Sequence, residues 1–317
     1  MPAEVYLDHI SFALGPVTQT LEQAAAKGLL VSSPAALREA GFGQHHMCAT
    51  GTSAFDLARA AVEPIRAAAS LANAMIYSTC IPANGNVGDA AAFTQTRDVK
   101  YLMDFPASRL QAVFGLEKAL IIGLSQQACT GLLGALRLAR SLILSEPGMA
   151  SVLCLTSDRF PPGALYEQSY NLISDGAAAC VVSLERSGFR LLSAHGITNG
   201  AMAGASDDET VGSYFTYAHR VIQETLEKAN LTLKDLAWII PQNMNIKAWQ
   251  ILSRLLPFDL SRVSCPSLPD VAHMISGDNL INLKRLTDDG RIQKGDKLLL
   301  FMAGYGLTWQ AVILERQ

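Results

Sequence analysis

The sequence has few charged residues and no long basic runs. Of its 317 residues, half are hydrophobic and only 17% are charged. This balance leaves little polar surface for a free monomer of this size, so we expect a buried subunit interface. The formal net charge is -3, and no run of Lys and Arg or basic-aromatic stripe occurs along the chain. Nucleic acid is therefore not an expected partner.

Targeting and membrane-spanning features are also missing from the sequence. The N-terminal segment scatters Glu4, Asp8, Glu22 and Lys27 among apolar residues, and it has no basic region followed by an apolar core. No uninterrupted stretch approaches the roughly 20 apolar residues of a membrane span. We therefore expect a cytoplasmic protein without a membrane span.

The cysteines form no metal-binding pattern. All six are far apart, no C-x-x-C pair occurs, and His45 to Cys48 is the only close Cys/His spacing. We therefore expect no metal and no cofactor. Cys154 and Cys180 stand in apolar runs of strand character, where free cysteine packs as a small hydrophobe. A structural role is favoured for five of the histidines: His9, His45, His46, His195 and His219.

Short apolar runs alternate with longer segments of helical periodicity. This alternation is typical of an α/β sandwich with buried, mostly mixed sheets. The length suggests two packed halves, and we place their boundary near 186, giving residues 1–186 and 187–317. The expected strands are Ala74–Thr79, Ala119–Leu124, Val152–Ser157, Ala178–Leu184, Leu191–His195, Ala237–Pro241, Lys297–Ala303 and Trp309–Leu314.

Helical periodicity and turn residues define the connections. Thr52 is the expected N-cap of the first long helix, and Ser276 or Asp278 that of the last. Pro82–Gly88 opens a connection to Phe105 that is long enough to be either functional or partly helical. The expected helices are Ser53–Ala69, Thr130–Leu144, Tyr214–Ala229, Ile246–Leu256 and Asp278–Thr287.

Cys129 is the candidate nucleophile. It follows the apolar run Leu120–Leu124 and precedes the small-residue helix that starts near Gly131. The first-turn N–H groups of a helix have no intrahelical acceptor and stabilise a thiolate. We therefore expect a lowered pKa for Cys129 and nucleophilic character near neutral pH.

Further motifs occur in the order found in one enzyme family. They are Phe105–Gly115, Gln127–Gly131, Ser174–Ala178, Leu236–Pro241, Asp289–Ile292 and Gly304–Trp309. In this order they resemble β-ketoacyl-acyl carrier protein synthase III and related condensing enzymes of the thiolase superfamily. The resemblance extends from about Gly41 to Val312. It implies a thiolase fold, a five-layered αβαβα sandwich of two similar halves, with Cys129 as the nucleophile.

The resemblance also implies that two of the family's catalytic residues are replaced in this chain. The family uses a His in an H-Q-A-N turn, where this chain has Gln242 followed by Asn243, Met244 and Asn245. It uses an Asn in a G-N-T-S turn, where this chain has His273. Catalytic roles are therefore expected for Cys129, His273 and Gln242, with Asn243 and Asn245 in support.

The family's oxyanion hole consists of backbone N–H groups. By the resemblance, these belong to Cys129 and to the glycine turn at Tyr305 and Gly306. Backbone donors survive a change of side chain, so we expect an intact hole. The Tyr305 ring is expected to narrow the pocket.

The arginines with which the family holds coenzyme A have no counterpart at the matching positions. Those stretches contain Glu39 and Glu167, and a carboxylate repels a phosphate. The expected acyl donor is an acyl-carrier-protein thioester, or a coenzyme A thioester that is held differently.

The resemblance implies an acyltransferase that forms an acyl-thioester on Cys129 and passes the acyl group to a second substrate in fatty acid, polyketide or other secondary-metabolite biosynthesis. A malonyl-type acceptor would give a β-ketoacyl product, and an amine or alcohol would give an amide or ester. A third alternative is a non-catalytic partner subunit, which retention of Cys129 argues against. The family's dimer predicts a homodimer or a heterodimer with a related chain, paired at Ala74–Thr79 or Ala119–Leu124.

Overall fold

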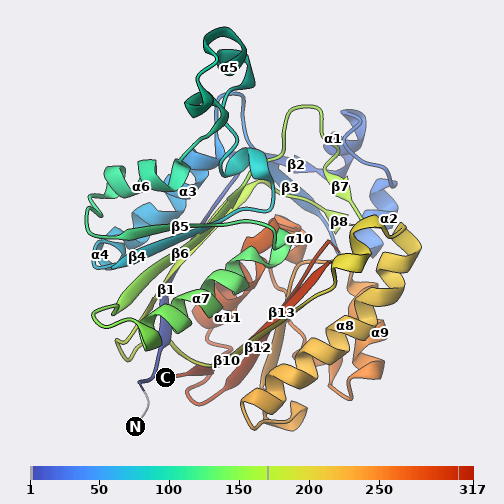
Figure 1. Ribbon diagram of the computed structural model, residues 1–317. Helices are drawn as coiled ribbons and strands as arrows, with labels where there is room; N and C mark the ends of the chain where they lie inside the picture. Colours follow the sequence, from blue (N-terminus) through green and yellow to red (C-terminus); the bar gives the residue numbers. More distant parts are fainter. Residues whose placement is uncertain (1–2, 170, 306) are drawn as a thin grey trace.

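One large sheet organises the chain. The computed structural model describes residues 3–169, 171–305 and 307–317. Among these residues, nine strands form a sheet in the order β11-β12-β13-β10-β1-β9-β6-β4-β5 (Figure 1). The strands are β1 (Tyr6–Leu14), β4 (Ala74–Ser78), β5 (Leu120–Leu124), β6 (Ser151–Asp158), β9 (Gly176–Ser183), β10 (Phe189–Thr198), β11 (Trp238–Pro241), β12 (Lys297–Gly304) and β13 (Thr308–Arg316).

The helices cover this sheet and fill the space inside it. They are α1 (Leu21–Ala26), α2 (Pro34–Glu39), α3 (Ala54–Val62), α4 (Arg66–Ala69), α5 (Ala90–Thr96), α6 (Pro106–Phe114), α7 (Gly131–Ser145), α8 (Asp207–Lys228), α9 (Ile246–Leu255), α10 (Leu268–Val271) and α11 (Asp278–Asp288). Two small hairpins, β2 (Val17–Thr20) with β3 (Gln44–Met47) and β7 (Glu167–Gln168) with β8 (Asn171–Leu172), lie outside the large sheet.

The large sheet bends between β1 and β10, and this bend gives the fold its five layers. β1 and β10 pair only at Tyr6↔Arg190 and Leu7↔Phe189, so the sheet bends there into two halves. Alternate residues of a strand face opposite sides. In β12, Leu298 and Leu300 therefore join the core cluster that contains α7 and α11, whereas Leu299 joins the one beneath α8 and α9.

The N-terminal half of the sheet shows the same alternation. Ile76 of β4 faces α7, whereas Met75 packs beneath α3 and α6 in the third large cluster. Two outer helical layers, two sheets and a central pair of helices therefore form the αβαβα sandwich. The predicted boundary near 186 falls between β9 and β10 and stays a prediction.

Most predicted elements are confirmed, with shifts at their ends. All eight predicted strands are present, whereas β1 and the short strands β2, β3, β7 and β8 were missed. The N-cap of α3 is Ser53 rather than Thr52, because the Ser53 and Asp56 side chains and backbone N–H groups bond reciprocally. The predicted caps of α11 are also wrong, since Gly277 is the N-cap and Asp278 lies in the first turn.

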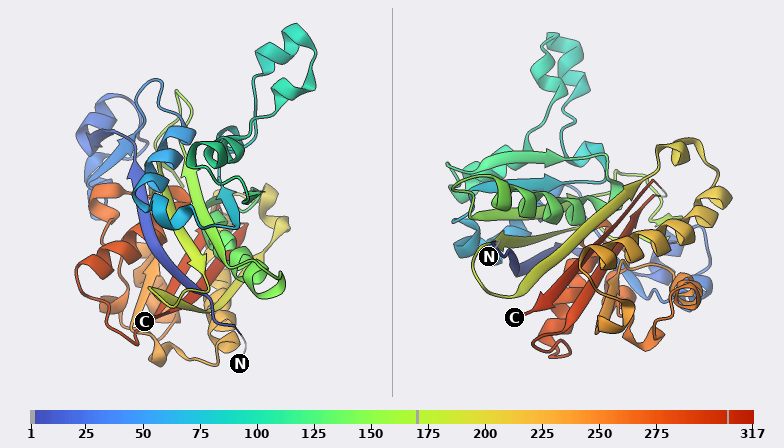
Figure 2. Two further views of the ribbon diagram at one scale, coloured as in Figure 1. Left: turned by 90° about the vertical axis from the view of Figure 1, so that its left-hand side faces the viewer. Right: turned by 60° about the horizontal axis from the view of Figure 1, so that its bottom comes forward.

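The long connection forms an arm that projects from the body. The 3₁₀ turn Pro82–Asn84, helix α5 and the 3₁₀ helix Val99–Leu102 make it partly helical, as predicted. Figures 1 and 2 show α5 at its tip, far from the sheets. Several large apolar side chains on the arm are exposed, namely Val87, Val99, Tyr101, Leu102 and Met103.

One long apolar helix among the described residues belongs to the core. Residues Ala128–Ser145 have a mean hydropathy of 1.3, enough by composition for a membrane span. However, Leu132, Leu133 and Leu136 of α7 lie in the central cluster between the two sheets. The apolar character of α7 is therefore explained by packing.

Candidate active site

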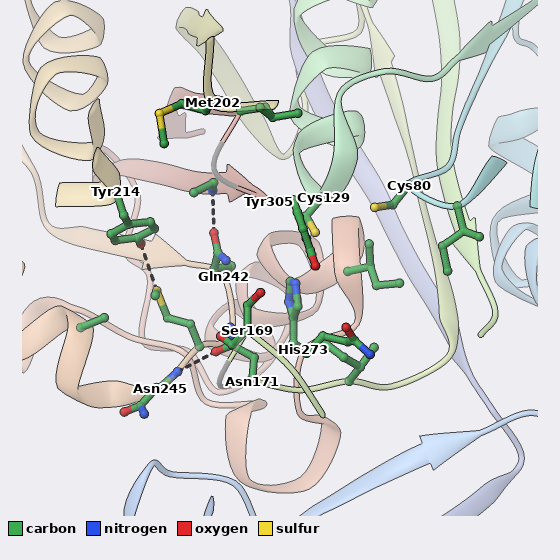
Figure 3. A pocket seen from close by; sticks show the side chains of 18 of the residues that line it. Cys80, Cys129, Ser169, Asn171, Met202, Tyr214, Gln242, Asn245, His273 and Tyr305 are labelled. Carbon is green, nitrogen blue, oxygen red and sulfur yellow. Dashed lines mark hydrogen bonds between the residues drawn. The ribbon is translucent and has the colours of Figure 1, made fainter. Parts of the chain in front are cut away.

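A cavity of about 760 Å³ opens at the interface between the two halves of the fold. Cys80 and Cys129 line it from the N-terminal half, and Gln242, His273 and Tyr305 line it from the C-terminal half (Figure 3). Apolar side chains from α8, α9 and their neighbours complete the wall: Met202, Tyr214, Phe215, Met244, Ala248 and Ile251. Such a cavity, mostly apolar with a few convergent polar groups, is typical of a small-molecule site.

The turn that presents Cys129 is held in an unusual backbone conformation. Gln126 and Ala128 have φ values of 65° and 45°, a left-handed region that non-glycine residues rarely adopt. The Thr130 hydroxyl donates to the Gln127 carbonyl at 2.7 Å. A Cβ on Gly304 would lie 2.8 Å from that same carbonyl oxygen, so only glycine allows β12 to approach the turn this closely.

The predicted lowering of the Cys129 pKa is wrong. Contact with the Cys80 thiol, burial, and the nearby carboxylates of Asp158 and Asp278 raise the pKa of Cys129 well above its usual value. Each of these influences opposes a negative charge on sulfur. At rest, Cys129 is therefore a thiol, and it needs a base in order to attack.

His273 is buried and oriented by a carboxylate that sequence reasoning missed. The His273 side chain is only 5% exposed, and its Nδ1 lies 2.5 Å from Oδ2 of Asp278. The Asp278 carboxylate is completely buried and also accepts N–H bonds from Asn243 and Met274, both at 2.7 Å. With Nδ1 engaged by Asp278, Nε2 is the nitrogen left for chemistry.

The only sequence signal for Asp278 was its spacing of five residues from His273 at the start of a helix. We assigned that position to helix capping. In the structure, the intervening 3₁₀ turn Ile275–Gly277 brings the Asp278 carboxylate back to the imidazole. A cysteine, a histidine and an orienting carboxylate are thus gathered around one cavity.

Gln242 presents its amide to the same cavity. Its Oε1 accepts the Ala303 N–H at 2.5 Å, which fixes the orientation of the amide because only oxygen can accept that hydrogen. Among the described residues, no protein acceptor engages its Nε2. Gln242 is therefore placed as predicted, with an N–H₂ donor available at the cavity wall.

The two predicted supporting asparagines lie in different settings. Asn243 is completely buried and does not line the cavity, but its N–H bonds Asp278 and its side chain bonds Ser267 and Ala272. It therefore supports the carboxylate behind His273. Asn245 lines the cavity and caps α9 through a 3.1 Å bond from the Lys247 N–H.

Of the residues predicted to form the oxyanion hole, the structure describes Cys129 and Tyr305. Tyr305 lines the cavity, has a φ of 44°, and in Figure 3 its ring extends beside Cys129 toward His273. That its side chain narrows the pocket stays a prediction. Gly306 lies outside the described residues, so an oxyanion hole built from Cys129, Tyr305 and Gly306 remains a prediction.

Glu167 has a structural role. Its carboxylate is buried and accepts hydrogen bonds from the N–H groups of Val31 and Ser32, at 2.8 and 2.7 Å, and from the Ser32 hydroxyl at 2.5 Å. Glu39, by contrast, is exposed and lies 3.7 Å from the ammonium group of Lys247, which lines the cavity. Of the two predicted carboxylates, Glu39 alone is exposed to solvent.

Cys154, Cys180 and His195 have the structural settings expected of them, and one other cysteine is an exception. Cys154 and Cys180 are completely buried, and His195 bonds Glu224 at 2.6 Å. Among the described residues, no group of three His, Cys, Asp or Glu side chains is arranged to hold a metal ion. The exception is Cys80, which lines the cavity although nothing in its sequence context distinguished it.

Comparison with known proteins identifies the family. Residues 125–200 match the model for 3-oxoacyl-[acyl-carrier-protein (ACP)] synthase III, and residues 226–316 match the model for its C-terminal part. The β-ketoacyl-[acyl-carrier-protein] synthase III of Rhizorhabdus wittichii is 28% identical over 290 residues, covering 84% of each chain. The chain belongs to the synthase III-like condensing enzymes of the thiolase superfamily.

Solved structures show the same fold. The 3-oxoacyl-(acyl carrier protein) synthase III of Pseudomonas aeruginosa superposes with a TM-score of 0.79 at 20% identity, covering 99% of this chain and 98% of that one. The acyltransferase ChlB3 superposes with a TM-score of 0.82 at 19% identity over the same shares. The predicted thiolase fold is confirmed.

Proposed function

We propose that this protein is an acyltransferase in which Cys129, His273 and Asp278 act as a unit. The observation that carries the proposal is the buried His273–Asp278 pair facing a cavity that also contains Cys129. An imidazole whose Nδ1–H is held by a carboxylate keeps Nε2 as a base. Because the pKa of Cys129 is raised, this base is needed to generate the nucleophile.

In the first half-reaction, Cys129 attacks the carbonyl carbon of an acyl thioester. The thiol proton passes to Nε2 of His273, and backbone N–H groups at Cys129 and Tyr305 stabilise the negative oxygen. The carbon–sulfur bond to the donor then breaks, and His273 returns the proton to the departing thiolate. The products are an acyl-enzyme and a free thiol of the carrier protein or coenzyme A.

In the second half-reaction, an acceptor takes the acyl group from Cys129. An amine or alcohol needs a general base, which His273 with Asp278 supplies. A malonyl-type thioester instead loses carbon dioxide and needs donors on the enolate oxygen, which the Gln242 amide and a protonated His273 supply. The fixed Nε2 donor of Gln242 is the specific observation that supports condensation as the second candidate.

We test the proposal by intact-mass spectrometry of the protein mixed with acyl thioesters of increasing chain length. The expected result is a mass increase equal to one acyl group, with release of one equivalent of thiol. The loaded protein is then given a malonyl thioester, an amine or an alcohol. Discharge with carbon dioxide release identifies condensation, and discharge without it identifies simple acyl transfer. A chain that is never acylated by any thioester would instead match a non-catalytic subunit.

We also propose that the chain pairs with a second copy or a related chain through β5. The alternative pairing at β4 is wrong, because β4 is hydrogen-bonded to β5 on one side and β6 on the other. β5 ends the sheet, and Leu120 on it is 52% exposed. An exposed apolar edge strand is usually covered by another chain.

The pairing predicts that Leu120→Glu shifts the protein toward monomers, because a charge on each side of a two-fold edge repels its copy. Leu255→Glu on α9, with a similarly exposed leucine of 51%, is the matched control and leaves the assembly unchanged. Light scattering at micromolar concentration gives the mass of each. A wild-type protein that is monomeric under these conditions contradicts the proposal.

A further inference from the structure

A second thiol, Cys80, faces the nucleophile inside the cavity. Cys80 follows β4 and Cys129 follows β5, and these parallel neighbours are in register at Ser78↔Leu124. Both residues therefore leave the sheet at the same edge. Figure 3 shows the Cys80 side chain directed toward Cys129, and both residues line the same cavity and pack against the same cluster.

The backbone on each side of this dithiol is fixed. The Cys80 N–H donates to both oxygens of Asp158, at 3.0 and 3.1 Å, and the Ile81 N–H donates to the same carboxylate at 3.0 Å. On the other side, the left-handed Ala128 and the hydrogen bonds of Thr130 fix the turn that carries Cys129. Because both anchors are rigid, the two sulfur atoms stay close to one another.

The acyl-transfer reaction described above uses only one of these sulfur atoms. We propose that Cys80 and Cys129 form a reversible oxidative modification site, in which a hydroperoxide converts the two thiols into a disulfide. One thiol is first oxidised to a sulfenic acid while the peroxide O–O bond breaks and an alcohol or water leaves. The other sulfur then attacks the sulfenic sulfur, a second water leaves, and the S–S bond forms.

Geometry and access distinguish this pair from the other cysteines. A disulfide needs converging side chains that can reach the bonded S–S distance of about 2.05 Å, and the register of β4 with β5 brings these two cysteines to the same side of one cavity. Cys80 and Cys129 are half-buried and reached through the cavity. Cys154 and Cys180 also lie directly opposite one another on β6 and β9, but both are completely buried.

Oxidation of the pair has two consequences. It removes the nucleophile, so acyl loading stops. It also protects Cys129, because a disulfide is reduced by thiols whereas sulfinic and sulfonic acids are not. The loss of loading rests on the proposed acyl-enzyme, but formation of the disulfide does not.

The test is treatment of the whole protein with hydrogen peroxide, followed by peptide mapping without reduction. The expected result is a cross-linked peptide pair containing Cys80 and Cys129, a loss of two hydrogen atoms, and return of both thiols with dithiothreitol. The internal control is Cys154 with Cys180, which stay reduced. Acyl loading, measured in parallel, is lost on oxidation and returns on reduction.

The matched variant is Cys80→Ala, compared with its own untreated sample. It is expected to accumulate sulfinic or sulfonic Cys129, with loading that dithiothreitol does not restore. Cys48→Ala, at another half-buried cysteine, is expected to behave as wild type. The proposal is overturned if wild-type protein forms no Cys80–Cys129 cross-link, or if the fate of Cys129 is the same with and without Cys80. If the cross-link forms but untreated protein is never acylated, the proposed function is contradicted. The proposed oxidative modification site is still supported in that case.

Discussion

Cys129→Ala is expected to abolish acyl loading and turnover. The acyl-enzyme is a thioester to this sulfur, which lines the same cavity as His273. Loss of a nucleophile in a catalytic unit of this kind costs roughly 10⁶-fold in rate. Intact-mass spectrometry after incubation with an acyl thioester measures loading directly.

Matched controls separate the loss of a nucleophile from the loss of a buried cysteine. Cys154→Ala and Cys180→Ala remove thiols that are completely buried in the central core. They are expected to lower stability, since each leaves a small cavity, but to retain loading. Acyl loading of Cys129→Ala to the wild-type level would contradict the proposal that Cys129 is the nucleophile.

His273→Ala is expected to slow both half-reactions by roughly 10²–10⁴-fold, the usual cost of losing a general acid-base. The effect has two sources, because the Cys129 thiol loses its proton acceptor and the departing thiolate loses its proton donor. Single-turnover measurements of loading and of discharge give the two rates separately. Free imidazole is expected to restore part of the activity of His273→Ala, an effect that a merely structural histidine would not show.

Asp278 is a positioning residue, and its effect is expected through His273. In Asp278→Asn, an amide N–H₂ group replaces one of the two oxygens that now accept N–H bonds from His273, Asn243 and Met274. The imidazole then loses the partner that leaves Nε2 as the base, and a comparable change in a Ser-His-Asp triad costs about 10⁴-fold in kcat.

A double variant tests this role of Asp278 more sharply than the rate alone. If Asp278 acts through the imidazole, adding Asp278→Asn to His273→Ala slows loading little further than His273→Ala alone. Circular dichroism confirms that the variants fold. His273→Gln, which keeps a side chain of similar size, controls for packing. Unchanged loading and discharge in both His273 variants would show that the base lies elsewhere.

The layers of the fold were predictable because burial leaves a clear pattern in the sequence. Strands such as β6 and β12 are apolar on both faces, since helices cover them on both sides. β1 was missed because its residues form neither an unbroken apolar run nor a regular alternation of buried and exposed positions. Tyr6 and Leu7 are buried, whereas His9 is exposed at a bulge where its φ is 52°. Pairing with β9, rather than local propensity, makes this segment a strand.

The candidate site was predictable only where a single residue carries the chemistry. The motifs around Cys129, Gln242 and His273 pointed to three residues that line one cavity. The Cys129 pKa was not predictable, because Cys80, Asp158 and Asp278 approach it from other elements of the fold. Asp278 and Cys80 were missed for the same reason, since their roles depend on tertiary contacts that no local spacing reveals.

The central claim is that Cys129 carries the acyl group, and the most direct measurement locates that group on the wild-type chain. The protein is incubated with an acyl thioester, digested at acidic pH to preserve thioesters, and its peptides are sequenced by tandem mass spectrometry. The account predicts one acyl group, on Cys129, that is released by hydroxylamine. An acyl group found on Cys80 or on another side chain, with Cys129 free, would contradict it.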